Sequence, residues 1–402
     1  MRILMIGKYP PIEGGVSSHI YWLARGLGEA GHEVSVVTNA GRVEEDYRIS
    51  LDVSDPEYRP RNVSVFSLTD APPRHIPFSE GYVTRLVALG LRAIEKNGAD
   101  VIYAHYLEPY GVAGLLLKQL TGLPLVVCHA GSDIYKLFKH TDYSYVLGRI
   151  LQSADIALMS HSLFDVANAL GIPQKRLRAI PPRSRHPAFS PEGKGFEFPH
   201  GWAKKGVPII VYLGKASKHK GLLELLSALA QSTNDFRLMF VSKGPLLKDI
   251  QERIARSAAL RERVMLSDFI PPWRVPSLLR SSDLLVQLEN RFPIPIHGPG
   301  QPAEAIACGT PLLLSEEMYK KLEHSFPRGR AQFSIVPDPQ DIDELQRVLN
   351  GALFDLPHAR KIAAPATEEM HATNDWDAYV ATHVEILEDA IRSRSLLRMF
   401  RH

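Results

Sequence analysis

Two stretches, VYLGKASKHKGLLELL (211–226) and QPAEAIACGTPLLLS (301–315), decide how this sequence folds. The first predicts an apolar strand, a lysine-rich loop and an amphipathic helix that opens at Gly221. The ammonium groups of Lys215 and Lys220 would then converge with the helix N-terminus, an arrangement that suits a phosphate or diphosphate. The second stretch predicts a helix with Glu304 near its start, followed by a strand.

A carboxylate at the position of Glu304 can accept hydrogen bonds from sugar hydroxyls. A cationic diphosphate site beside such a carboxylate indicates a nucleotide sugar as ligand. The two stretches also restart a strand–helix alternation that already runs through the first half of the chain. Alternation of this kind predicts an α/β protein with doubly wound parallel sheets.

These residues resemble the retaining glycosyltransferases of family 4, in which the first stretch typically reads G-R-x-x-x-x-K-G. Four residues of this sequence fall at that spacing: Gly214, Lys215, Lys220 and Gly221. The latter half of the family's E-x-x-x-x-x-x-x-E-A-x-A-x-G-x-P-V motif is matched by Glu304, Ala305, Ala307, Gly309, Thr310 and Pro311. The resemblance covers most of the chain. It implies the GT-B fold, in which two Rossmann-like domains face a central cleft and a C-terminal helix crosses back to the first domain.

Length and composition agree with two ordinary globular domains. The 402 residues are 45% apolar and 23% charged, and the net charge of +3 gives no reason to expect nucleic-acid binding. Cys128 and Cys308 stand in apolar surroundings, which predicts buried thiols in a reducing compartment. The sequence lacks a signal peptide and a membrane-spanning apolar run, so we expect a cytoplasmic protein.

Apolar runs predict six strands in each half of the chain. They cover 2–7, 33–38, 63–67, 100–105, 124–130 and 155–160, then 208–214, 237–244, 263–268, 283–289, 311–315 and 333–337. The Pro- and Gly-rich stretch 181–201 reads as a linker. We therefore expect an acceptor-binding domain over 1–185, a nucleotide-sugar-binding domain over 186–375, and a crossover helix with a basic tail over 376–402.

The loop after the first predicted strand carries Gly14 and Gly15. Glycines there let backbone N–H groups approach a ligand at the start of the next helix, although a tight turn alone would also need them. The pattern is not the G-x-G-x-x-G fingerprint, which disfavours a dinucleotide-dependent oxidoreductase. In the family that the chain resembles, this double glycine lies beside the donor diphosphate and the acceptor.

Three polar residues follow strands of the first domain, at the sheet edge where open α/β folds bind ligands. The resemblance implies that His129 contacts the donor sugar and helps to stabilise its developing positive charge. Asp133 and His105 are candidates for acceptor contact, although a histidine after a strand often has only a structural role.

The sequence departs from the family pattern at two places. Lys215 stands where the family usually has Arg, so it supplies charge without a bidentate fork. Ile296 stands where the family has the first motif glutamate, and Glu289 lies upstream at the wrong spacing. A loop of different composition, His297, Gly298, Pro299 and Gly300, is expected to contact the donor instead.

Phe269 and Ile270 follow a predicted strand where the resemblance implies contact with the nucleobase, although both also suit a core. The D-x-D strings at 341–343 and 375–377 open predicted helices, so we interpret them as helix caps and expect no catalytic metal. The basic tail 392–402 is a candidate for peripheral contact with an anionic membrane.

The sequence thus predicts a metal-independent retaining glycosyltransferase without a cofactor, acting on a glycan, lipid-linked or small-molecule acceptor in polysaccharide, glycolipid or glycoconjugate biosynthesis. UDP-sugars are the favoured donors, followed by GDP-mannose. His129, Lys215 and Lys220 are the predicted catalytic residues. A nucleotide-sugar epimerase of the same fold and a nucleotide-binding pseudoenzyme are the alternatives, and the oligomeric state stays open.

Overall fold

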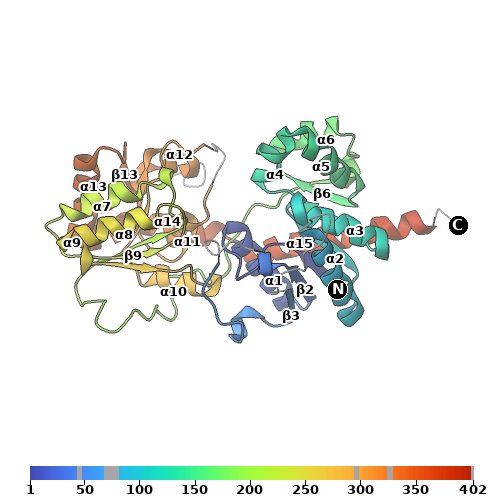
Figure 1. Ribbon diagram of the computed structural model, residues 1–402, viewed down its shortest axis with the longest axis horizontal. Helices are drawn as coiled ribbons and strands as arrows, with labels where there is room; N and C mark the ends of the chain where they lie inside the picture. Colours follow the sequence, from blue (N-terminus) through green and yellow to red (C-terminus); the bar gives the residue numbers. More distant parts are fainter. Residues whose placement is uncertain (43–47, 68–80, 294–297, 324–328, 400–402) are drawn as a thin grey trace. The chain divides into compact units, whose positions relative to one another are not determined.

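The computed structural model describes residues 1–42, 48–67, 81–293, 298–323 and 329–399 (Figure 1). The chain forms two compact units. One comprises Met1–Glu45, Asp52–Ser184 and Asp375–His402, and the other comprises Asp46–Leu51 and Arg185–Asn374. Apart from the short segment Asp46–Leu51, the chain therefore crosses from the first unit to the second after Ser184 and returns after Asn374.

The first unit is built on a seven-stranded parallel sheet in the order β3-β2-β1-β4-β5-β6-β7. Its strands are β1 (Arg2–Ile6), β2 (Glu33–Thr38), β3 (Val63–Ser67), β4 (Val101–His105), β5 (Leu125–Cys128), β6 (Ile156–Met159) and β7 (Leu177–Ala179). Its helices are α1 (Gly15–Glu29), α2 (Tyr82–Asn97), α3 (Val112–Thr121), α4 (Gly131–Tyr135), α5 (Thr141–Ser153), α6 (Phe164–Ala169) and α15 (Trp376–Met399).

The second unit has a six-stranded parallel sheet in the order β10-β9-β8-β11-β12-β13. Its strands are β8 (Ile209–Leu213), β9 (Arg237–Val241), β10 (Val264–Ser267), β11 (Leu284–Gln287), β12 (Leu312–Ser315) and β13 (Ser334–Val336). Its helices are α7 (Leu222–Ala230), α8 (Leu247–Arg256), α9 (Ala258–Arg261), α10 (Val275–Arg280), α11 (Gln301–Ala307), α12 (Glu316–Leu322), α13 (Ile342–Phe354) and α14 (Leu356–Thr373).

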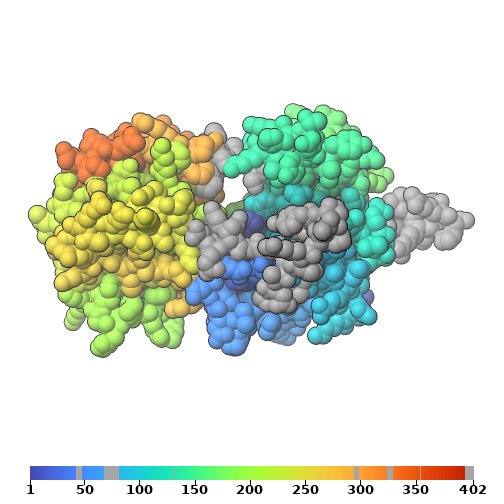
Figure 2. Space-filling view, viewed as in Figure 1, coloured from blue at the N-terminus to red at the C-terminus, as the bar shows by residue number. Residues whose placement is uncertain are grey.

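The central strands are buried along their whole length, because helices cover both faces of a doubly wound sheet. Each unit has its own hydrophobic core of strand and helix side chains. Helices rich in charged residues face outward. Helix α8 (LKDIQERIAR) lies on the surface seen in Figure 2, and its residue Ile250 is buried against the core. Each core therefore holds a rigid sheet whose carboxyl edge carries the loops described below.

Helix α15 belongs to the first unit, where it contacts α1, β4 and β5. Trp376 and Val380 of α15 pack so closely against Gly26 of α1 that a side-chain carbon on this glycine would come within 2.7 Å of Trp376. His383 is buried beside Tyr379 and Tyr103. The predicted return of the C-terminal helix to the first domain is therefore confirmed.

The predicted α/β class with doubly wound parallel sheets is confirmed, and the predicted strands are all present. The short edge strand β7 and the helices α2, α4, α5, α6, α9, α12 and α14 were not predicted from the sequence. Both D-x-D strings act as caps, as predicted. Asp341 accepts a hydrogen bond from the backbone N–H of Glu344 at 3.0 Å, and Asp375 accepts one from Ala378 at 2.8 Å. Cys128 and Cys308 are buried free thiols.

Because His383 of helix α15 is buried, the free energy of unfolding should depend on pH. Burial lowers the pKa of His383 to about 4. As pH falls below about 6.5, the unfolded chain takes up the proton first, so stability is lost between pH 6.5 and pH 4. We expect wild type to lose about 3 kcal/mol relative to His383→Gln over this window. Urea unfolding of both proteins at a series of pH values measures it, and parallel curves would contradict the assignment.

Candidate active site

The second sheet reverses its strand order between β8 and β11, which are hydrogen-bonded neighbours. From β8 the chain proceeds through β9 and β10 on one side, whereas β12 and β13 extend the other side. Open α/β sheets bind ligands at the carboxyl edge at such a reversal, because the loops diverge and leave a crevice. The loops after β8 and β11 are therefore the first place to look for a site.

Gly221 allows these two loops to meet. Its φ of +64° is left-handed, and a side-chain carbon there would lie 2.6 Å from Cβ and 2.8 Å from the carbonyl oxygen of Leu288. Glycine is thus required both by its conformation and by the close approach. The consequence is that Lys220, the last residue of the short turn Lys218–Lys220, lies next to Glu289.

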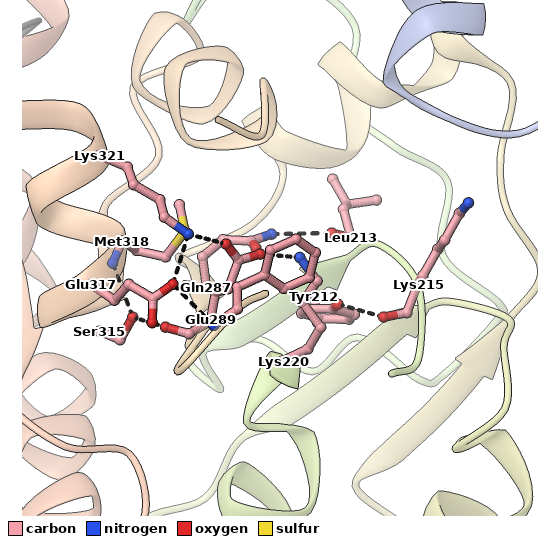
Figure 3. A network of polar contacts seen from close by, with 11 residues as sticks. Tyr212, Leu213, Lys215, Lys220, Gln287, Glu289, Ser315, Glu317, Met318 and Lys321 are labelled. Carbon is pink, nitrogen blue, oxygen red and sulfur yellow. Dashed lines mark hydrogen bonds and ion pairs between the residues drawn. The ribbon is translucent and has the colours of Figure 1, made fainter. Parts of the chain in front are cut away.

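A buried carboxylate links two ammonium groups at this point (Figure 3). Oε2 of Glu289 pairs with Nζ of Lys220, and Oε1 accepts from Nζ of Lys321 at 2.5 Å. Glu289 is 0% exposed, and the lysine side chains are each 11% exposed. The three residues follow β8, β11 and β12, which are consecutive in the sheet. One carboxylate therefore ties together the chain segments that follow three neighbouring strands.

Helix α12 is tied to the same point. The hydroxyl of Ser315 caps α12 by accepting from the backbone N–H of Met318 at 3.1 Å, and it donates to the backbone carbonyl of Glu289. The cap fixes the first turn of α12 relative to Glu289, and Lys321 lies on the next turn. The position of Lys321 is thus set by the backbone as well as by its ion pair.

The ring of Phe292 covers both ammonium groups, with Nζ of Lys220 4.5 Å and Nζ of Lys321 5.4 Å from its centroid. Glu317 completes the network. Its Oε1 accepts from Nζ of Lys321 at 2.7 Å and from the backbone N–H of Phe292 at 3.3 Å. Cations held on an aromatic face and on carboxylates have a fixed orientation, which suits them to bind an anion.

Lys215 has a different position from Lys220. Its backbone carbonyl accepts from the hydroxyl of Tyr212 at 3.0 Å, and Figure 3 shows its side chain pointing away from Glu289. The loop after β8 is also held by the loop after β9, because the N–H of Ala216 donates to the carbonyl of Lys243 at 2.8 Å. The two lysines predicted as a pair thus come from one loop but face different surroundings.

Glu304 lies in the first turn of α11 and is half-buried. Its N–H donates to the carbonyl of Gly300 at 3.1 Å, and a side-chain carbon on Gly300 would contact its Oε1 at 3.3 Å. Gly298 is exposed with open space around it, and Pro299 is half-buried. Ile296 and His297 lie outside the described residues, so the predicted role of His297 stays a prediction.

Phe269 is 5% exposed. Its backbone forms a parallel bridge with Ile49, and its carbonyl accepts from the N–H of Ser50 at 3.0 Å. A short segment of the amino-terminal half thus pairs with the loop after β10, within the second unit. Ile270 is half-buried. The expected base contacts therefore lie on a loop with defined backbone partners.

The first sheet reverses its order between β1 and β4. Gly14 and Gly15 lie at the start of α1, after β1, and a side-chain carbon on either would have nothing within 4 Å. His105 ends β4, and its ring centroid lies 5.2 Å from that of His19 in α1. Burial lowers the pKa of His105 to about 3, with Arg183 acting in the same direction, so the ring is neutral.

His129 follows β5, the neighbour of β4. Its Nε2 accepts a hydrogen bond from the backbone N–H of Ser160 at 3.1 Å, and burial lowers its pKa. A neutral ring that accepts at Nε2 carries its proton on Nδ1. Nδ1 is buried and has no hydrogen-bond partner among the described residues. The ring also interacts with the backbone of Ala130, and its hydrogen bond at Nε2 fixes the direction of the Nδ1–H donor.

Asp133 lies in α4 and is 0% exposed. Its Oδ2 accepts from the backbone N–H of Leu107 at 3.0 Å and of Ala130 at 2.9 Å, which ties the loops after β4 and β5 together. Its Oδ1 is buried without a partner among the described residues, and burial raises the pKa of the carboxyl to about 6. The three predicted residues of the first domain thus gather at one sheet edge.

The roles of Glu289, Phe292, Glu317 and Lys321 were not predicted from the sequence. Glu289 does not fall at the spacing of the family motif. The available signal was its place directly after an apolar strand that precedes a loop, where the carboxyl edge of a parallel sheet holds ligand-binding residues. No pattern in the sequence pointed to Lys321 as a site residue, because its closeness to Glu289 depends on the pairing of β11 with β12.

In the part of the chain that the structure describes, no helix is long and apolar enough to cross a membrane. The side chains of the predicted basic tail from residue 394 onward lie outside the described residues, so peripheral membrane contact stays a prediction.

The two doubly wound units and their loop sites define a two-domain transferase. Residues 14–183 match the model of a glycosyl transferase 4-like domain, and residues 196–368 match the model of glycosyl transferases group 1. The chain belongs to glycosyltransferase family 4 and has the GT-B fold. It is therefore an enzyme that transfers a sugar from a nucleotide-sugar donor.

Its relatives are distant. N-acetyl-alpha-D-glucosaminyl L-malate synthase of Bacillus anthracis is 22% identical over 304 residues, 72% of this chain and 73% of the relative. The fold is similar to that of sucrose-phosphate synthase from Thermosynechococcus elongatus, with a TM-score of 0.64 at 19% identity, covering 98% and 99% of the two chains. HepE of Anabaena in complex with UDP and glucose gives a TM-score of 0.64 at 17% identity, covering 96% and 99%.

The contact of Gly221 with Leu288 gives a testable consequence. Gly221→Ala puts a methyl group against Leu288 and a left-handed backbone on a residue that disfavours it, so we expect a loss of about 2 kcal/mol in unfolding free energy. Donor binding should fall as well, because the loops carrying Lys220 and Glu289 must separate. Gly206→Ala, with a φ of +78° and open space around it, is the matched control for the backbone effect. Equal losses in both variants would contradict the close-packing argument.

The buried carboxyl of Asp133 leads to a second testable prediction. Because its folded pKa is raised to about 6, the stability that it contributes is present below pH 4 and is lost as pH rises through 6. Asp133→Asn cannot ionise, so its unfolding free energy relative to wild type should increase by about 3 kcal/mol from pH 4 to pH 7. Chemical denaturation at both pH values measures this difference. A difference independent of pH would show that Asp133 is ionised normally.

Proposed function

We propose that this enzyme transfers a sugar, with retention of anomeric configuration, from a UDP-sugar to a hydroxyl acceptor. The observation that carries the proposal is the ammonium group of Lys220, which Glu289 holds where the second sheet reverses its order. Fixed cations at that edge suit the diphosphate of a donor. The structure of HepE with UDP supports UDP as the nucleotide, with GDP-mannose as the second candidate donor.

The second unit would bind the donor. Lys220 and Lys215 act on the diphosphate, Glu304 accepts from ribose hydroxyls, and the loop containing Gly298, Pro299 and Gly300 contacts the sugar and phosphate. Phe269 and Ile270 lie on the loop proposed to meet the base. The second unit has the group 1 match, and the residues named follow β8, β10 and β11 of its sheet.

The first unit would complete the reaction. The Nδ1–H of His129 is a buried donor whose direction is fixed by the hydrogen bond at Nε2, which supports contact with a sugar hydroxyl. Asp133 positions the loops after β4 and β5, and His105 contributes a neutral ring to the same edge. Gly14 and Gly15 expose the first turn of α1 to the ligand.

In the proposed step, the bond from the anomeric carbon to the diphosphate oxygen breaks and a bond to the acceptor oxygen forms on the same face. The acceptor hydroxyl gives its proton to the departing phosphate oxygen. Negative charge develops on that phosphate, so preorganised ammonium groups and backbone N–H groups lower the barrier. The acceptor is a hydroxyl of a glycan, a glycolipid or a small molecule, consistent with a role in glycan or glycoconjugate synthesis.

Thermal-shift titration of the full chain with UDP, GDP, ADP and their common sugar conjugates tests the donor site. The matching nucleotide should raise the unfolding midpoint, because it binds the folded state only. Lys220→Ala should weaken this binding roughly tenfold or more, since it removes a charge-assisted contact. EDTA should not change the shift if ammonium groups alone bind the diphosphate.

Lys218→Ala is the matched control, because Lys218 is exposed in the same turn as Lys220. It should leave the shift unchanged. Absence of a shift with every nucleotide would overturn the donor site. Conversion of the sugar nucleotide to an epimer without acceptor would instead favour the epimerase alternative, and binding without turnover on any acceptor would favour the pseudoenzyme.

A further inference from the structure

We propose that Glu317 occupies, with its own carboxylate, an anion site that receives a phosphate oxygen of the donor, and that Lys321 is a ligand of that site. This inference rests on the proposed function, because it names two further residues of the same diphosphate site. Neither residue belongs to the motifs that identify the family in this sequence. The proposal follows from the contacts in Figure 3.

The first observation is how the oxygen of Glu317 is held. Oε1 of Glu317 accepts from the ammonium of Lys321 at 2.7 Å and from the backbone N–H of Phe292 at 3.3 Å. One anionic oxygen held by an ammonium group and a backbone N–H is the environment that proteins offer to phosphate oxygens. The position is thus built for an anion, and the chain supplies one itself.

The second observation is the charge balance. Glu289 is fully buried and pairs with two ammonium groups, so these three residues carry one positive charge in excess. Burying an unbalanced charge is costly, and a second anion is needed nearby. Glu317 supplies it from a more exposed position, since its side chain is 27% exposed. The excess charge therefore attracts whichever anion lies next to Lys321.

The third observation concerns which carboxylate can leave. Glu289 bridges two lysines, and its backbone is held by Ser315, so it is fixed on several sides. Glu317 stands on the first turn of a short helix and can rotate into water, where its charge is well solvated. A diphosphate oxygen would replace Glu317 and would keep the buried charge balanced. Lys220, on the other oxygen of Glu289, would contact the same diphosphate from the opposite side.

Glu317 then competes with the diphosphate for Lys321, so one substitution should strengthen UDP binding and another should weaken it. Glu317→Gln keeps the shape but removes the charge, so UDP should bind about three- to fivefold more tightly. Lys321→Met keeps the apolar stem, and UDP should bind roughly tenfold more weakly. In the double variant the gain from Glu317→Gln should disappear, because that gain depends on Lys321.

Isothermal titration calorimetry of the full chain with UDP measures these affinities, with GDP or ADP used if the nucleotide screen selects that base. Uridine or the matching nucleoside, which has no phosphate, should bind wild type and Glu317→Gln equally. Inorganic pyrophosphate should compete more strongly in Glu317→Gln than in wild type. Both results would place the effect at the diphosphate instead of the base.

The matched controls lie on the same helix. Glu316 pairs with Arg330 and Lys320 is exposed, so Glu316→Gln and Lys320→Met should each leave the UDP affinity within about twofold of wild type. If Lys321 and Glu317 only stabilise α12, Glu317→Gln would lower the unfolding midpoint without tightening UDP, and the inference would be wrong. If Lys220→Ala abolishes binding while both new variants bind as wild type, the inference fails and the proposed donor site stands. Absence of nucleotide binding in wild type would overturn both.

Discussion

The carboxylate of Glu289 is the constraint on which the second unit's site depends. A fully buried charge must be compensated, and Glu289 is compensated by Lys220 and Lys321 at its two oxygens. The three residues come from the segments that follow β8, β11 and β12, so one carboxylate with two ion pairs defines the geometry at the point where the sheet reverses its order. That arrangement requires glycine at position 221, because any side chain there would collide with Leu288.

The first unit organises its sheet edge by a different physical means. At this edge it buries neutral or weakly acidic groups, and burial shifts their pKa values. His105 and His129 are held neutral, and the carboxyl of Asp133 has a raised pKa of about 6. Polar atoms of His129 and Asp133 are buried without partners among the described residues. Such atoms are costly unless a ligand completes them, which is the feature expected of a site that binds hydroxyl groups.

Much of the fold could be predicted from the sequence. Strands of a doubly wound sheet are buried on both faces, so they appear as short apolar runs that are easy to recognise. For two of the helices that were not predicted, the local sequence explains why. In α5, Tyr143, Tyr145 and Val146 are exposed, so its apolar residues do not mark one face. Helix α14 contains Pro365, which normally argues against a helix interior. The family motifs pointed to Lys220, Gly221 and Glu304 as candidates, because each motif lies within one strand–loop–helix segment.

The sequence by itself determined the alternation of strands and helices, the family, and those site residues that lie close together along the chain. Only the tertiary structure decided that Lys220 meets Glu289, that Lys321 and Glu317 join them, and that the Nδ1 of His129 is a donor. The contacts of Glu289 with Lys220 and Lys321, and that of His129 with Ser160, join residues 31 to 69 positions apart. They depend on strand order and on the register between neighbouring strands, which no local pattern encodes. The partners of a buried charge are the groups that the fold brings next to it, and the order of residues along the chain does not give those distances.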